Sequence, residues 1–287
     1  MISLLFVIIG HFAYGITNTL WYNPRNTIGT LPLIMIRSFS CFVIFLLSHL
    51  LLTHYNVIPI KAFNYQDVFS TIQICVVNYF GLFFYLQSLK HTQVSNAIGF
   101  SKIGLVLGIV VGYYFYNEPL SISKIALGML ILIGIALIEK SQKIKNEKLS
   151  RGLIYSILSR IFWATGFLFV PFINKLGVLL FCSILEAVVF IMSLLLYIFS
   201  KKEVIHVANN KIKQEILLLV LLGTIGTFSL NFAIVTTKSI FVFAFLGLIE
   251  PIVGLITSKV YHKERLNKFQ FIGICLGLIA SFILSLV

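Results

Sequence analysis

The sequence predicts an all-α integral membrane protein with ten transmembrane helices, arranged as two inverted repeats of five. Of its 287 residues, 59% are hydrophobic and only 11% are charged, and the mean hydropathy is +1.01. Soluble domains are about 45–50% apolar and about 25% charged. Apolar stretches of about 20 residues recur along the chain, each long enough to cross a hydrocarbon core of about 30 Å as a helix. They do not alternate in polarity as the strands of a membrane barrel do, so the spans are predicted to be helical.

Ten such stretches account for nearly the whole chain. The predicted spans are 2–21, 31–52, 67–89, 94–116, 120–139, 151–173, 177–199, 214–236, 239–261 and 267–287. The first begins without a basic segment or a small-residue cleavage site, so we interpret it as a retained helix rather than a signal peptide. The longest polar segments between spans are too short to fold as separate domains.

The cysteines and the net charge do not point to a specific partner. Cys41, Cys75, Cys182 and Cys275 all fall within predicted spans at wide spacing, so we expect neither a disulfide framework nor a zinc site. The net charge of +13 needs no nucleic-acid partner, because Lys and Arg gather at the ends of membrane helices. No cofactor and no metal are expected.

The two halves of the chain repeat one another. The segment Asn117–Leu120, which closes the fourth span, resembles Lys263–Leu266, which closes the ninth, at an offset of 146 residues. Further pairs at similar offsets are Gly108 with Gly254, His11 with Arg160, Tyr14 with Trp163, Arg37 with Glu186, and Lys90 with Lys238. The predicted organisation is a first repeat over 1–139, a linker over 140–150 and a second repeat over 151–287. Because five spans is an odd number, the second repeat is inverted in the bilayer, as in many secondary transporters.

These features resemble the drug/metabolite transporter superfamily, and within it the ten-span proteins with two EamA domains. The resemblance covers nearly the whole chain. It depends on the five-plus-five arrangement, on Arg37 in the second span, on Pro251 and the Glu264–Leu266 ending of the ninth, and on Asn117–Leu120. It implies a membrane transporter, often with cytoplasmic termini. One departure is the fourth span, where the family's proline would fall near Leu105 and this chain instead has Lys102 close by.

Charged residues within the apolar spans are the first candidates for the functional site. Glu250 directly precedes Pro251. A proline in a helix frees a backbone carbonyl that must find a partner in the protein or beside water, and a carboxylate in lipid is costly unless paired, protonated or hydrated. We therefore expect both residues to line an interior cavity, with Pro251, Gly254 and Gly108 as hinge positions. The following segment, 258–266, is interpreted as an ordinary span ending.

The complete predicted substrate-binding set combines ionisable and aromatic residues that should face the bundle interior. It comprises His11, Tyr14, Arg37, Tyr79, Lys102, Arg160, Trp163, Glu186 and Glu250, with Tyr85 as a further aromatic neighbour. Arg37 and Glu186 have an equally good alternative interpretation as an ion pair that only orients helices, since buried charges need partners whatever they do. Lys102, Arg160 and Glu250 are favoured as substrate or ion contacts. His11 fits an interior hydrogen bond as well as a proton carrier, and the aromatic residues fit packing equally well.

The predicted function is gradient-driven transport of a small metabolite by alternating access around a midplane cavity. The sequence has no GxxxxGK[ST] phosphate-binding loop, so we expect no ATP-driven pumping by this chain alone. Proton coupling through Glu250, Glu186 or His11 and uncoupled exchange are both compatible with the sequence. Cations, carboxylates and aromatics together would suit an amino acid, another zwitterion or an organic anion. A lipid flippase of the same superfamily is the main alternative. An integral membrane enzyme is less favoured, because the sequence has no paired acid–base motif.

The distribution of basic residues predicts an orientation in a bacterial-type inner membrane. Fifteen Lys and Arg residues fall in or beside the odd-numbered loops and four in or beside the even-numbered ones. The positive-inside rule then places the odd loops in the cytoplasm and both termini outside, opposite to what the family resemblance implies. The expected partners are a small-molecule substrate and the lipid bilayer. The sequence allows either a monomer or a homodimer.

Overall fold

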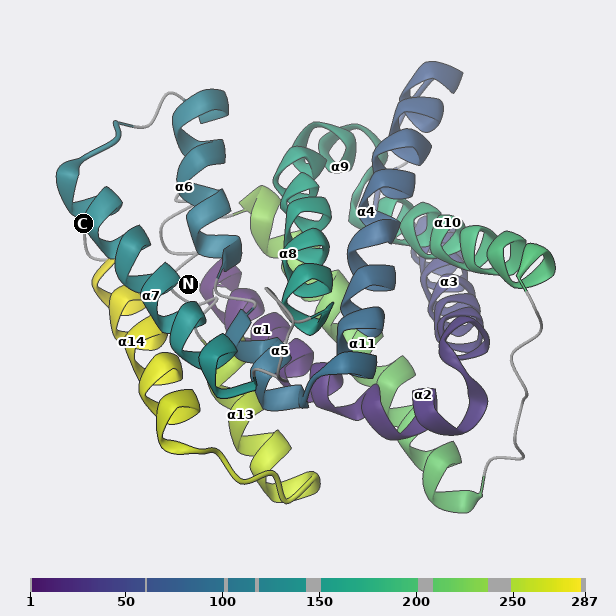
Figure 1. The fold of residues 1–287 in the computed structure, drawn as a ribbon. Helices are drawn as coiled ribbons and strands as arrows, with labels where there is room; N and C mark the ends of the chain where they lie inside the picture. The colour runs from purple at the N-terminus through teal and green to yellow at the C-terminus, as the bar shows by residue number, and fades with distance from the viewer. Residues whose placement is uncertain are drawn as a thin grey trace. The chain divides into compact units, whose positions relative to one another are not determined.

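The computed structural model describes residues 2–59, 61–100, 103–116, 119–142, 151–200, 209–236 and 249–284, and the regular structure within these ranges is entirely helical (Figure 1). This confirms the predicted all-α class. Six described helices are long and apolar enough to cross a membrane. They are α1 (Ile2–Leu20), α3 (Thr30–His54), α4 (Tyr65–His91), α7 (Ile122–Gln142), α10 (Val178–Phe199) and α11 (Asn210–Thr236). Each exposes large apolar side chains, as a lipid-facing surface requires.

Shorter helices occupy the remaining predicted spans and two of the connections. They are α2 (Tyr22–Ile28), α5 (Val94–Phe100), α6 (Ile103–Tyr116), α8 (Arg151–Trp163), α9 (Val170–Leu176), α13 (Ile249–Tyr261) and α14 (Lys268–Leu284), with a 3₁₀ helix η1 (Ala164–Phe169). Residues 101–102 of the predicted fourth span and 239–248 of the predicted ninth lie outside the described residues. The count of ten spans stays a prediction.

The sixth predicted span differs from the single helix expected over 151–173. The α-helix α8 ends at Trp163, η1 follows, and α9 continues with its axis bent by 47° from that of the preceding segment. Gly166 within η1 is a weak helix former. Pro171 lacks the N–H that a continuous α-helix would need and is tolerated in the first turn of α9. The break therefore has a local sequence cause.

The short helices α2 and α9 end in the same way. Gly29 after α2 has φ of 93° and Gly177 after α9 has φ of 84°, a backbone region that L-residues with a side chain rarely adopt. Each glycine directly precedes a long helix, α3 or α10. These glycines let the chain turn from a short connecting helix into a membrane span.

The chain forms two compact units, each built from segments of both sequence halves. The first contains Met1–Tyr79 and Thr165–Lys238, and the second contains Phe80–Ala164 and Ser239–Val287. In the first unit α3 packs along α10 and α1 along α11. In the second unit α7 packs along α14, and α5 contacts α8 and α13 (Figure 1). The repeat boundaries inferred from the sequence stay a prediction.

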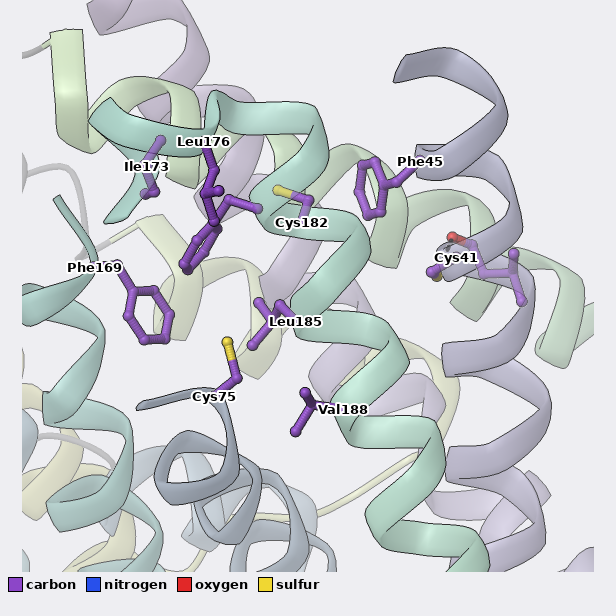
Figure 2. Close-up of a cluster of buried hydrophobic side chains, with 11 residues drawn as sticks. Cys41, Phe45, Cys75, Phe169, Ile173, Leu176, Cys182, Leu185 and Val188 are labelled. Atoms are coloured by element: carbon purple, nitrogen blue, oxygen red, sulfur yellow. Dashed lines mark hydrogen bonds between the residues drawn. The ribbon is translucent and has the colours of Figure 1, made fainter. Parts of the chain in front are cut away.

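Each unit has its own apolar core. Figure 2 shows the core of the first unit, where Cys41, Cys75 and Cys182 lie among aliphatic and aromatic side chains such as Phe45 and Phe169. All four cysteines of the chain are free thiols. The core of the second unit includes Phe100, Ile131, Ile138, Leu153 and Ile274. The buried thiols therefore act as small apolar packing groups.

Candidate functional site

A buried ion pair joins α3 and α10 in the first unit. Arg37 Nη1 lies 2.5 Å from both carboxylate oxygens of Glu186. The two residues are only 6% and 2% exposed. A charge buried away from water is costly unless it is paired and hydrogen-bonded, and the close packing of α3 on α10 provides that pairing. The ion pair that the sequence offered as one of two interpretations of these residues is therefore present.

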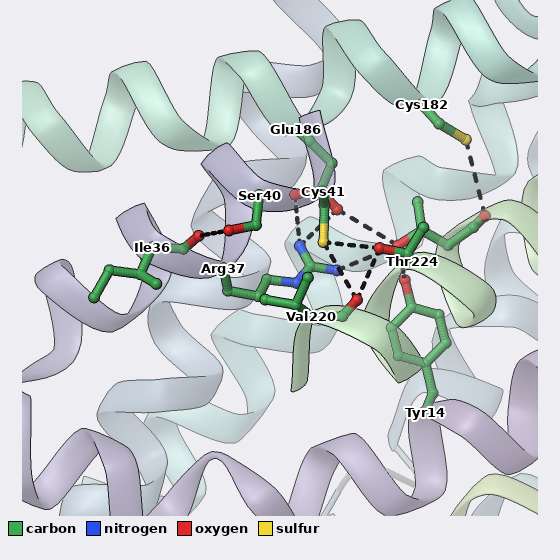
Figure 3. Close-up of polar contacts among 10 residues, drawn as sticks. Tyr14, Ile36, Arg37, Ser40, Cys41, Cys182, Glu186, Val220 and Thr224 are labelled. Atoms are coloured by element: carbon green, nitrogen blue, oxygen red, sulfur yellow. Dashed lines mark hydrogen bonds and ion pairs between the residues drawn. The ribbon is translucent and has the colours of Figure 1, made fainter. Parts of the chain in front are cut away.

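Two hydroxyl groups extend the ion pair onto α11 and α1 (Figure 3). Arg37 Nη2 donates to Thr227 Oγ1 at 3.3 Å, and the Thr227 hydroxyl lies 3.5 Å from Glu186 Oε1. Tyr14 Oη lies 2.8 Å from Thr227 Oγ1. The predicted residues Tyr14, Arg37 and Glu186 are therefore brought together on one network, with Thr227 at its centre.

Small residues of α11 make room for this network. A Cβ added to Gly223 would lie 2.9 Å from Arg37 Nη2, and one added to Gly226 would lie 3.2 Å from the Tyr14 ring. Thr224, beside Gly223, donates a hydrogen bond from its hydroxyl to the Val220 carbonyl at 2.8 Å, and the same oxygen lies 3.2 Å from Cys41 Sγ. The sequence interpretation missed Thr227 and these glycines. The available signal was the run of small residues within an otherwise apolar span.

A second cluster of predicted residues lies in the second unit. The Arg160 guanidinium lies over the Trp163 ring, 4.7 Å from its centroid. The Tyr85 and Trp163 rings are 5.5 Å apart. Glu250 is close enough to Arg160 to interact electrostatically, and the Arg160 side chain rests 3.5 Å from the position of a Cβ on Gly104. Helices α4, α6, α8 and α13 thus converge on one guanidinium.

The two clusters differ in how their charges are satisfied. The Arg37 guanidinium donates hydrogen bonds to the Glu186 carboxylate and the Thr227 hydroxyl. For Arg160, no side chain within the described ranges makes a hydrogen bond to the guanidinium, which has five N–H donors. Arg160, Trp163 and Glu250 are all partly exposed. The Arg160 guanidinium therefore has hydrogen-bonding capacity that no described side chain uses.

The other predicted residues are placed as follows. His11 is buried on α1 one turn before Tyr14. Tyr79 is fully buried on α4 and accepts a hydrogen bond from Ser193 Oγ at 3.2 Å. Of the hinge candidates, Gly108 lies in α6, and Pro251 and Gly254 are buried in α13. Lys102 lies outside the described residues.

One functional candidate was missed because its segment was interpreted as an ordinary span ending. The Glu264 carboxylate accepts hydrogen bonds from the backbone N–H groups of Val94 and Ser95, both at 2.9 Å, and from Ser258 Oγ at 2.5 Å. It therefore joins the chain after α13 to the start of α5. The repeat of the motif around Glu118 and Glu264 was the sequence signal, and Glu118 itself lies outside the described residues.

Comparison with known proteins assigns the family. The profile of the EamA-like transporter family matches residues 1–139 and again residues 150–286. The chain belongs to the EamA-like transporter family. This EamA-like protein, with its several apolar helices, is a multi-pass integral membrane protein.

Individual relatives of this EamA-like protein are distant. A segment of 106 residues is 24% identical to an uncharacterized transporter, YxxF, of Bacillus subtilis (strain 168). The matched segment is 36% of this chain and 34% of that relative, so it spans about a third of the curated protein's length. One solved crystal structure matches with a TM-score of 0.70 at 13% identity, covering 99% of this chain and 98% of its own. That likeness shows a shared fold.

Proposed function

We propose that this EamA-like protein is a secondary transporter of a small metabolite, and that Arg160, Trp163 and Glu250 contact the substrate. The observation that carries the proposal is the guanidinium of Arg160, whose Cζ lies over the Trp163 ring and which has no hydrogen-bond partner among the described residues. A contact with an aromatic ring through Cζ uses none of the N–H donors of arginine in a conventional hydrogen bond, so they stay available for a carboxylate or phosphate. Such a residue inside an apolar bundle is a functional candidate by default.

The chemistry around Arg160 supports a zwitterion or an organic anion with an apolar part. Arg160 offers a site for a carboxylate, and Glu250 on α13 provides negative charge nearby. The Trp163 and Tyr85 rings give an apolar surface to the same site. In the first unit, the Arg37–Glu186 pair satisfies itself, so its proposed role is to orient α3 and α10. Lys102, which follows α5 in the sequence, remains part of the proposed substrate site.

We propose transport by alternating access within two inverted repeats. Helix pairs in both units support this symmetry. The pairs α3 with α10, α7 with α14 and α5 with α13 join spans that correspond between the halves. The pair α1 with α11 joins the first and eighth spans. Because the first span corresponds to the sixth and the eighth to the third, the symmetry-related pair would join the sixth and third spans. Stacking of Phe84 on α4 with Tyr155 and Phe162 on α8 provides that counterpart. The two separate family matches support the same boundaries.

Gradients would drive such a transporter. Coupling to protons through Glu250 and exchange without coupling both fit the proposed site, and Gly108, Pro251 and Gly254 are the proposed hinge positions. Pro251 suits this role because it lies within α13, where a proline removes one backbone hydrogen bond and favours a kink.

A thermal-shift screen tests the substrate site. Purified protein would be heated with a panel of amino acids, other zwitterions and organic anions, because a ligand that binds the folded state raises the melting temperature. We expect a stabilising ligand whose effect is lost in Arg160→Ala, Lys102→Ala and Glu250→Ala. Asp67→Asn, at an exposed ion pair with Lys175, is the control and should keep the response.

The opposite pattern would reject the assignment. If a ligand stabilises the wild type and all three variants equally, the substrate does not bind at Arg160. If uptake into sealed vesicles never exceeds that of empty vesicles for any stabilising ligand, transport itself is excluded, and movement of fluorescent lipid between leaflets would then favour the flippase alternative.

A further inference from the structure

The carboxylate of Glu264, in the loop after α13, hydrogen-bonds to the start of α5. Both oxygens of Glu264 are used: Oε1 accepts from the Val94 N–H, and Oε2 accepts from the Ser95 N–H and from Ser258 Oγ. These backbone N–H groups belong to the first turn of α5, where no intrahelical partner exists. Val94 and Ser95 are buried, so the loss of the carboxylate would leave two buried donors unsatisfied.

The backbone that presents Glu264 is held in an unusual conformation. Lys263, the preceding residue, has φ of 53°, a region that costs free energy for a residue with a side chain and persists only where the surroundings enforce it. Such strain is found at functional sites and switch regions more than elsewhere. The hydrogen bonds of Glu264 therefore offset the backbone strain at Lys263. Because the strain is relieved when these hydrogen bonds break, the net free energy needed to open the contact is reduced.

A second contact reinforces the first from α14. Gln270 Nε2 donates to Asn96 Oδ1 at 2.9 Å and lies 3.4 Å from Gln93 Oε1. Gln270 is itself held because its Oε1 accepts from the Asn267 N–H at 2.7 Å. Two side chains therefore hydrogen-bond to the start of α5: Glu264 from the segment between α13 and α14, and Gln270 from the first turn of α14. We call the contacts of Glu264 and Gln270 with residues 93–96 the α5 clasp.

The clasp acts on the helices that carry the proposed substrate residues. Helix α5 contacts α8, which bears Arg160, and α13, which bears Glu250. Ser258, bound to Glu264, lies on α13 eight residues beyond Glu250. Residue 102 is the second residue after α5 in the sequence. A carboxylate at the loop end of the unit therefore fixes the relative positions of helices that meet at the Arg160 cluster.

We infer that Glu264 is a positioning residue that holds the start of α5 against the α13–α14 connection, at the face of the odd-numbered loops. We also infer that the α5 clasp opens during transport. This inference rests on the proposed alternating-access function. While the clasp is closed, the first turn of α5 is buried. When it opens, α5 separates from the α13–α14 connection, residues 94 and 95 become exposed, and the substrate groups rearrange.

Cysteine labelling tests the inference without a known substrate. In a variant with the four native cysteines replaced by serine, Ser95→Cys places a reporter at a position that is 2% exposed and leaves its backbone N–H intact. A membrane-impermeant maleimide is applied to sealed vesicles of each orientation. Gln93→Cys, which is exposed beside the clasp, identifies the accessible face and should label at one rate throughout.

We expect Glu264→Gln to raise the labelling rate at position 95 by about tenfold or more from the odd-loop face, because hydrogen bonds to a charged acceptor are among the strongest. Ser258→Ala removes one hydrogen bond and should raise the rate by less. Asp67→Asn breaks the ion pair with Lys175 in the other unit and should leave the rate unchanged.

An unchanged labelling rate at position 95 in both Glu264→Gln and Ser258→Ala would overturn the inference. So would an equal rise of that rate in Asp67→Asn. A labelling rate as high as that of the unfolded protein would also overturn it, because the variant would then have lost its fold. If Glu264→Gln does not fold, Ser258→Ala decides alone. Labelling that follows the expected pattern while vesicle uptake fails for every solute would leave the clasp intact and reject the proposed transport function.

Discussion

At the scale of single residues, the Arg37–Glu186 pair shows how far charges in apolar spans can be interpreted from sequence. Each residue was recognisable because a charge in lipid is costly and usually functional or paired, and their equivalent positions in the two repeats made an ion pair one of two interpretations. The structure joins them at 2.5 Å. The link that Thr227 provides between this pair and the predicted residue Tyr14 could not be predicted, because hydroxyls in helices often bond to their own backbone, as Thr224 does to Val220.

Removal of one partner should be far more damaging than removal of both. Glu186→Ala leaves the Arg37 guanidinium buried with only the Thr227 hydroxyl, and breaking a buried pair in this way costs about 3–5 kcal/mol. The double variant Arg37→Met with Glu186→Leu should recover most of that loss, since apolar side chains of similar volume can replace a buried pair. Unfolding in mixed detergent micelles, followed by circular dichroism, measures both.

The matched control is the ion pair of Lys175 with Asp67. Lys175 is 58% exposed, and exposed pairs contribute about 0–1 kcal/mol, so Asp67→Asn should change stability little. A Glu186→Ala variant as stable as Asp67→Asn would show that the Arg37 charge reaches water or lipid headgroups. A double variant that is stable yet inactive in transport would assign the pair a role beyond orientation of α3 and α10.

At the scale of helices, six of the ten predicted spans coincide with helices long and apolar enough to cross a membrane, whereas the interruptions were not predicted. The hydropathy of residues 151–173 is continuous, so the apolar pattern alone favours one helix. Gly166 and Pro171 were the local signals for the 3₁₀ segment and the 47° bend. The same limit applies to the loop after α13, where a Lys/Glu/Arg cluster looked like a solvated helix end. Only the three-dimensional contacts reveal that Glu264 caps a helix about 170 residues away.

The crossing of α7 with α14 depends on two facing glycines. A Cβ on Gly134 would lie 2.6 Å from the Gly273 carbonyl oxygen, and a Cβ on Gly273 would collide with the Gly134 carbonyl. Neither backbone can move aside cheaply, so Gly134→Ala should destabilise the fold by about 1–3 kcal/mol. Close backbone approach through small residues is a common way to pack membrane helices. Detergent unfolding of the purified variant measures the loss.

A second glycine of the same helix provides the control. A Cβ on Gly128 would meet only Ile109 Cδ1 at 3.7 Å, an ordinary contact. Gly128→Ala should therefore be neutral or stabilise by up to about 1 kcal/mol, because alanine is the better helix former. Equal losses at both positions would mean that the loss at Gly134 does not come from its contact with α14, and equal tolerance would mean that α7 and α14 separate easily.

At the scale of the whole molecule, contacts between connecting segments support the predicted order of spans. Loops with the same parity should lie on one face of the membrane. Asn23 in the first connection bonds to Glu215 after the seventh. Lys61 in the second bonds to the Asn174 carbonyl in the sixth. Glu264 in the ninth bonds to residues that follow the third. Each contact joins loops of equal parity, as ten spans require, although no apolar pattern in the sequence specifies them.

The orientation predicted from the charge can be measured with two fusions. Fifteen Lys and Arg residues in or beside the odd loops against four for the even loops predict that the odd loops lie in the cytoplasm, because basic loops resist translocation. We therefore expect a reporter active only outside the cytoplasm to function at the C-terminus and to be silent when fused at Lys145 in the linker. A reporter that fluoresces only in the cytoplasm should be silent at the C-terminus and fluoresce at Lys145.

The opposite result for both reporters would mean that the charge bias is overridden and the family's usual orientation applies. Both fusions on one side would contradict an odd number of spans after the linker, and with it the inverted repeat on which alternating access depends.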